Sequence, residues 1–234
     1  MNKSFKVVFS KARGALMVVN ELTSSVQAKG TKTVIAVAVA SLVAGGAMAA
    51  DTAKPGALLS WNGTELVGQA EGEGLVYSTK DGVLTITATG QKTGAEGVPG
   101  YGVVTNLYHA DATGGTDILA KTGVSITGSN FKNNASTNAG GAVTLWQDGG
   151  AEAQPLAHRI SASTFEGNSA NFGGAVALMN QIAFAKNDGT TLSEGNVYKS
   201  NTGASGGAIY VEGSVLTSKG DVFTKNLSLI HISE

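Results

Sequence analysis

The hydrophobic positions of this chain follow two related patterns. From about Thr122 onward, short segments repeat an aromatic residue, an asparagine three positions later, and then Gly-Gly-Ala followed by alternating apolar residues. Upstream, apolar and polar residues alternate over residues 83–87, between turn signals at 80–82 and 97–100. Alternation with a period of two is typical of strands that bury one face. The pattern therefore predicts an all-β protein with many turns.

Three segments of the repeat align, and they begin at Ile126, Ile160 and Ser193. Their shared positions are the aromatic residues Phe131, Phe165 and Tyr198, the asparagines Asn134, Asn168 and Asn201, and the glycine pairs Gly140 and Gly141, Gly173 and Gly174, and Gly206 and Gly207. A fourth copy starts with Phe223 and Asn226. The glycine pairs recur every 33 residues, which suits one coil of three short strands and their connections.

This spacing predicts a solenoid in which equivalent residues stack about 4.8 Å above one another. The aromatic residues should form a buried column, and the asparagines a ladder at a bend where they adopt left-handed backbone angles. The glycine pairs should supply positive φ at another corner, before Val143, Val176 and Ile209 point inward. We interpret all these repeated residues as scaffold, without contact to a ligand.

The paired motifs also carry a resemblance. FKNN, FEGN and FTKN, combined with GGAV, GGAV and GGAI, are similar to the repeats of polymorphic outer-membrane proteins and related autotransporter adhesins, and YKSN at Tyr198 departs conservatively. The resemblance covers residues 122–226. It implies a right-handed parallel β-helix with an adhesive role.

The chain begins with a leader in two parts. Residues 34–43 form an apolar run, preceded by Lys29 and Lys32 and followed by small residues up to Ala49. This is the layout of a cleaved signal peptide, and cleavage is expected after Ala49 or Ala50. The alternative, a transmembrane anchor, is disfavoured because a bilayer needs roughly 20 apolar residues.

Residues 1–25 precede that signal and read MNKSFKVVFSKARGALMVVNELTSS. They resemble the extended signal peptide region of type V secretion proteins, with Phe9 where that family usually has Trp. The resemblance implies that the leader meets the inner-membrane secretion machinery and signal peptidase. It further implies presentation at the cell surface or outer membrane of a Gram-negative bacterium, or release outside it.

The expected organisation has five parts. They are the extended signal peptide region 1–25, the signal peptide 26–49, both helical or disordered, an N-terminal cap with irregular first coils 50–121, the β-helix repeats of a passenger 122–226, and a non-native tail 227–234. The tail breaks the fourth copy, and SLIHISE resembles translated sequencing adapter. The chain is thus expected to be a fragment that lacks further coils and its own C-terminal β-barrel.

Charge and composition exclude several activities. Residues 1–49 carry six basic and one acidic side chain, and the remainder ten basic and sixteen acidic. No basic cluster follows Lys32, which argues against nucleic-acid binding. The absence of cysteine removes thiolate metal sites and cysteine nucleophiles.

The sequence offers little for catalysis. After the leader the histidines are His109, His158 and His231, and no G-x-S-x-G surrounds a serine. Asp111 and Asp117 are too sparse for a calcium site, and the GGTD at 114–117 does not recur. We expect no cofactor, no metal and no enzymatic activity. Two alternatives stay open: an autotransporter enzyme, such as a protease or polysaccharide lyase, whose catalytic part is missing, and a purely structural stalk.

Binding is the remaining interpretation. Residues 147–158 and 181–192 follow the Gly-Gly-Ala strands of successive copies, so they should project from the same side. That side is the predicted contact face for a receptor on host or neighbouring cells.

Overall fold

The computed structural model describes residues 5–10, 15–20, 56–109, 117–146, 155–179 and 189–229. The chain divides into two compact units, Met1–Ser41 and Leu42–Glu234. In the first, β1 (Phe5–Ser10) pairs antiparallel with β2 (Ala15–Asn20). This hairpin differs from the helical or disordered leader that we expected, because both segments are rich in valine and other residues that favour strands. The apolar run and the cleavage position at Ala49 or Ala50 lie outside the described residues.

The second unit consists of strands that stack in four parallel ladders. Ladder 1 contains the first half of β6 (Val83–Thr89), β11 (Ser125–Thr127), β15 (Ala157–Ser161), β19 (Thr190–Glu194) and β23 (Val215–Lys219). Ladder 2 contains the second half of β6, β12 (Asn130–Lys132), β16 (Thr164–Glu166), β20 (Val197–Lys199) and β24 (Val222–Thr224).

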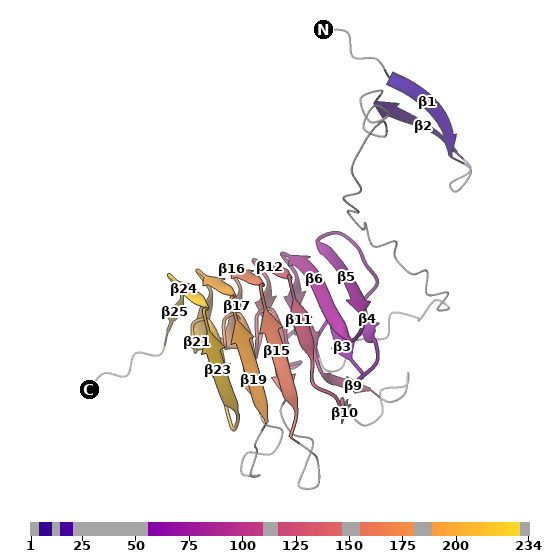
Figure 1. Ribbon diagram of the computed structural model, residues 1–234. Helices are drawn as coiled ribbons and strands as arrows, with labels where there is room; N and C mark the ends of the chain where they lie inside the picture. The colour runs from indigo at the N-terminus through magenta and orange to yellow at the C-terminus, as the bar shows by residue number, and fades with distance from the viewer. Residues whose placement is uncertain are drawn as a thin grey trace. The chain divides into compact units, whose positions relative to one another are not determined.

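The other two ladders complete each coil. Ladder 3 contains β7 (Lys92–Thr93), β13 (Ala135–Ser136), β17 (Ser169–Phe172), β21 (Thr202–Ser205) and β25 (Leu227–Ser228). Ladder 4 contains β3 (Leu59–Trp61), β8 (Val104–Thr105), β14 (Val143–Trp146), β18 (Val176–Met179) and β22 (Ile209–Val211). Figure 1 shows these strands stacked from purple to yellow along one axis.

This arrangement is a parallel β-helix, which confirms the predicted fold class. Every assigned element among the described residues is a strand. Within that described part, no helix has the length and apolarity needed to cross a membrane.

The coil itself differs from the expected one in two ways. It has four strand positions instead of three, because a bend with positive φ at Gly128, Ala162, Gly195 and Gly220 divides what looks like one strand in the sequence. Its length is also shorter where nothing is inserted: Tyr198 pairs with Phe223, 25 residues later. The spacing of 33 residues therefore contains a 25-residue coil and an insertion at one corner.

Antiparallel strands occupy the N-terminal edge of the stack. β4 (Leu66–Gly68) pairs with β3, and β5 (Leu75–Lys80) pairs with β6 along its whole length. The Trp61 indole N–H also donates to the Thr122 hydroxyl at 3.2 Å. Because these strands run against the direction of the coils, no further parallel coil continues the ladders beyond them.

The core lies inside the coils as columns of like residues. In ladder 1, Leu84, Ile126 and Ile160 stack in register, and in ladder 4, Val104, Val143 and Val176 do the same. All six side chains are buried. Each such side chain contributes about 1.5–3 kcal/mol through burial, so the core fixes which face of every strand points inward.

Candidate functional site: the scaffold and its insertion corner

The repeated aromatic residues form a continuous column in ladder 2. The ring centroids of Phe131, Phe165, Tyr198 and Phe223 are 5.0, 4.9 and 4.8 Å apart in turn, with the ring planes within 9° of one another. The first three are fully buried, whereas Phe223 is 49% exposed. The Tyr198 hydroxyl lies 3.0 Å from the Ser193 hydroxyl, and burial raises the pKa of Tyr198 above its ordinary value. The column therefore contributes to packing and leaves no reactive group free.

The asparagines form a ladder directly beside this column. The backbone N–H and the Nδ2 of Asn134 both donate to Oδ1 of Asn168, at 3.0 and 2.9 Å. Asn168 repeats both bonds to Asn201, and Asn201 repeats them to Asn226. Each Nδ2 also donates to a carbonyl of the preceding coil, such as that of Phe131 for Asn168. Every buried polar atom of this side chain thus has a partner from another coil.

The ladder asparagines do not themselves adopt left-handed angles, and that part of our expectation was wrong. The residues before them do: Asn133, Gly167, Ser200 and Lys225 have φ of 53°, 68°, 54° and 55°. The preceding residue turns the chain, so that the asparagine enters the coil with its amide directed along the stack. Its hydrogen bonds to two neighbouring coils select Asn at this position, and a positive φ does not.

A second polar ladder lies at the bend between ladders 1 and 2, and sequence reasoning missed it. The backbone N–H of Ser129 donates to Ser163 Oγ at 3.1 Å, that of Ser163 to Asn196 Oδ1 at 2.9 Å, and that of Asn196 to Asp221 Oδ1 at 2.8 Å. The signal was present: each of these residues stands two positions before an aromatic residue of the column. It was overlooked because Ser, Asn and Asp differ in name but share an acceptor oxygen.

The two glycines of each pair have different functions. Gly140, Gly173 and Gly206 have positive φ of 49°, 66° and 68°, which L-residues rarely adopt. Their neighbours pack against the next coil: a Cβ on Gly141 would lie 2.2 Å from the carbonyl oxygen of Gly174. After the pair, Val143 and Val176 are buried and Ile209 packs partly buried against the core.

The coils differ from one another at a single corner, between ladders 4 and 1. Ten residues connect β14 to β15 and ten connect β18 to β19, but three connect β22 to β23. In the preceding coil the same connection contains a hairpin of β9 (Leu107–His109) and β10 (Asp117–Leu119). We call this place the insertion corner.

The insertions leave and re-enter the stack in register. Trp146 pairs with Met179 where they leave, and Ala157 pairs with Thr190 where they return. The bases of successive insertions are therefore one strand spacing apart, about 4.8 Å. Residues 147–154 and 180–188, which make up most of the predicted contact loops, lie outside the described residues.

Buried polar side chains hold the base of the first ten-residue insertion. Asn106 clamps the backbone of Trp146: its Oδ1 accepts from the N–H at 2.7 Å and its Nδ2 donates to the carbonyl at 2.8 Å. His158 Nδ1 accepts from the N–H of Val124 at 2.9 Å, so its proton is assigned to Nε2, which donates to the Trp146 carbonyl at 3.2 Å. Burial lowers the pKa of His158 to about 4.

The residues that we considered for catalysis are not assembled into a site in the part that the structure describes. Both ring nitrogens of His158 are hydrogen-bonded to backbone. His109 and Asp117 are strand partners in the β9–β10 hairpin, and Asp111 and His231 lie outside the described residues. Among the residues described, no three His, Asp or Glu side chains are grouped to hold a metal ion.

The outer surface of ladders 1 and 2 carries alternating charges. Glu166 lies between Lys199 at 2.8 Å and Lys132 at 3.8 Å, and Glu194 lies between Arg159 and Lys219, at 2.6 and 3.6 Å. The hydrogen bond from Lys199, with the charges of both lysines, lowers the pKa of Glu166. Exposed pairs of this kind contribute little stability, but they neutralise the basic side chains nearby.

Fold and site together define a β-helical repeat protein whose variable part is one corner of the coil. Comparison with known proteins then characterises its leader: residues 1–50 match the family model described as Extended Signal Peptide of Type V secretion system. This match indicates a leader that directs export across the envelope of a Gram-negative bacterium, and it supports an autotransporter. No curated protein and no solved structure matches the chain.

Proposed function

We propose that this chain is the passenger part of an autotransporter, displayed at the bacterial surface, where it binds host or neighbouring cells through its insertion corner. The leader supports export by a type V route. The resemblance of the FxxN and GGA[ILV] motifs to polymorphic outer-membrane proteins supports an adhesive role. We propose that the chain acts by binding and not by catalysis.

The observation that carries the proposal is the register of the insertions. Ladders 1 to 4 are held by buried columns and polar ladders, which leave little freedom for sequence change. The insertion corner alone varies in length from coil to coil. Loops on a rigid scaffold are where binding residues concentrate, and in-register bases place successive loops side by side. A multi-point contact face results, which suits a large surface such as a protein or glycan layer.

The last coil supplies the template for a test. In register, Glu212 follows Trp146 and Met179, and Val215 follows Ala157 and Thr190, so Gly213 and Ser214 correspond to a whole insertion. Replacing residues 147–156 and 180–189 each by Gly-Ser therefore rebuilds a connection that the fold already uses. The free energy of unfolding should change by less than about 1–2 kcal/mol, because the columns stay intact.

Binding should respond quite differently. Labelled chain with both replacements should lose at least tenfold in binding to epithelial cells and to sister bacteria, measured by flow cytometry. The matched control is Lys132→Ser with Lys199→Ser on the outer surface of ladder 2, which should bind as the unaltered chain does. Unchanged binding of the loop-replaced chain would contradict the proposal and favour a structural stalk.

A further inference from the structure

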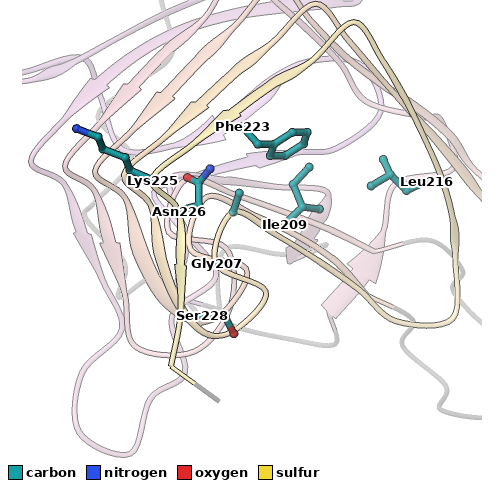
Figure 2. Close-up of a pocket in the computed structure, with 8 residues that line it drawn as sticks. Gly207, Ile209, Leu216, Phe223, Lys225, Asn226 and Ser228 are labelled. Atoms are coloured by element: carbon teal, nitrogen blue, oxygen red, sulfur yellow. The ribbon is translucent and has the colours of Figure 1, made fainter. Parts of the chain in front are cut away.

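The last described coil has one face that no described residue covers. On β22 to β25 the large apolar side chains are half exposed or more: Val215 is 53% exposed, Phe223 49% and Leu227 53%. In the inner coils the equivalents of Phe223 are fully buried. A cavity of about 430 Å³ opens on this face. Figure 2 shows it between Ile209, Leu216 and Phe223, with Lys225 and Asn226 at its margin.

This face continues an interface that the molecule already uses several times. Phe165 receives the ring of Tyr198 on the corresponding face, and Tyr198 receives the ring of Phe223, each at about 5 Å. Val176 likewise receives Ile209 in ladder 4. The cavity is bounded by side chains at these same positions, so its shape is that of a coil's underside: one aromatic ring flanked by aliphatic groups.

The hydrogen bonds of both polar ladders point the same way along the stack. Each ladder N–H donates to a side-chain oxygen of the following coil, as Asn168 does to Asn201 and Ser163 does to Asn196. At the open end, no described residue accepts from the N–H of Asp221 or Asn226. The open face therefore presents donors, and its occupant must bring acceptor oxygens at two defined places.

The opposite edge of the stack cannot serve the same purpose. There β4 and β5 pair antiparallel with β3 and β6, and their direction is incompatible with a parallel coil. Figure 1 shows this closed edge in purple and the open edge in yellow. A second copy could not stack head to tail on the open face without losing its own cap.

We infer that the open face binds one further coil of the same polypeptide. The recognised pattern is an acceptor residue (Ser, Asn or Asp), then an aromatic residue two positions later and Asn three positions after that, aligned with Asp221, Phe223 and Asn226. This inference rests on the coil interface and is independent of the proposed adhesive function.

A register-preserving insertion tests it in the full chain. A second copy of residues 201–225 inserted between Lys225 and Asn226 adds one 25-residue coil, because Asn201 and Asn226 occupy equivalent positions. The chain has no cysteine, so Leu216→Cys in the original coil reports on the face through its rate of reaction with a soluble disulfide reagent. The added coil should slow this reaction at least tenfold and raise the melting temperature.

Three controls make the outcome decisive. The same insertion with the added Phe replaced by Ser and the added Asn by Ala should give no protection. Val76→Cys, 56% exposed at the capped end, should react equally fast with and without the added coil. A second insertion, residues 168–200 at the same point, repeats the test with a 33-residue coil.

Two results would overturn the inference. One is a thiol at position 216 that stays equally reactive in both insertion variants, whether or not they fold. The other is a chain without any insertion that sediments as a dimer with that thiol already protected, since a second copy would then be the occupant.

Discussion

Two turns of the same coil behave in opposite ways. At the bend that precedes ladder 3, every coil has the same length, a residue with positive φ, and then an asparagine bonded to the coils on both sides. At the insertion corner the connection ranges from three residues to a β-hairpin. The difference lies in the hydrogen bonds: at the asparagine bend the backbone depends on side chains of other coils, whereas insertions leave after the last paired residue of ladder 4. A solenoid can thus vary only where its turns are not linked to one another.

The largest effect should come from changing the length of the two turns. Inserting Gly-Gly between Asn133 and Asn134 moves the asparagine out of register with Asn168 and separates it from Phe131. We expect a loss of more than 4 kcal/mol in the free energy of unfolding, or no folding. The same Gly-Gly inserted between Gly149 and Gly150 should cost less than about 1 kcal/mol. Urea unfolding followed by circular dichroism measures both, and equal losses would refute the comparison.

A substitution within the bend should have a somewhat smaller effect. Asn168→Ala removes the acceptor of the Asn134 N–H and the donor to the Phe131 carbonyl, both buried. At about 1–3 kcal/mol for each unsatisfied group, the free energy of unfolding should fall by about 4 kcal/mol. Asn171→Ala is the matched control, since Asn171 is exposed and has one bond to the Thr137 carbonyl. Its cost should stay below 1 kcal/mol in the same measurement, and a similar loss in both variants would contradict a special contribution from the ladder.

The base of the insertion corner should depend on pH. The pKa of His158 is lowered from 6.5 to about 4 in the folded chain, so the unfolded chain takes up the proton first as the pH falls. The stabilisation by neutral His158 is complete above pH 6.5 and is lost between pH 6.5 and 4, by roughly 3 kcal/mol.

The variant His158→Gln isolates this contribution. It has no imidazole at this position, so the difference in unfolding free energy between it and the unaltered chain should shrink as the pH falls from 6.5 to 4. Titrations at several pH values, by urea unfolding, give this difference directly. A difference that stays constant over that range would show that His158 is not held neutral by the clamp.

Much of the scaffold was predictable because it is written as a repeat. Phe131, Phe165 and Tyr198 recur at nearly constant spacing and occupy one column, and the glycine pairs mark a corner with positive φ. The leader was equally readable, since its pattern is local. The insertion corner was anticipated only as a side of the coil, because its position follows from the strands on either side of it.

The sequence by itself determined the period, the all-β class, the inward aromatic residues and the exported leader, since each of these is a property of neighbouring residues or of spacing. Only the tertiary structure decided the four strands per coil, the ladder of Ser129, Ser163, Asn196 and Asp221, and the clamp of Asn106 and His158 on Trp146. The physical reason is that these hydrogen bonds mostly join atoms 25 to 40 residues apart. Their partners become neighbours only after the coils have stacked.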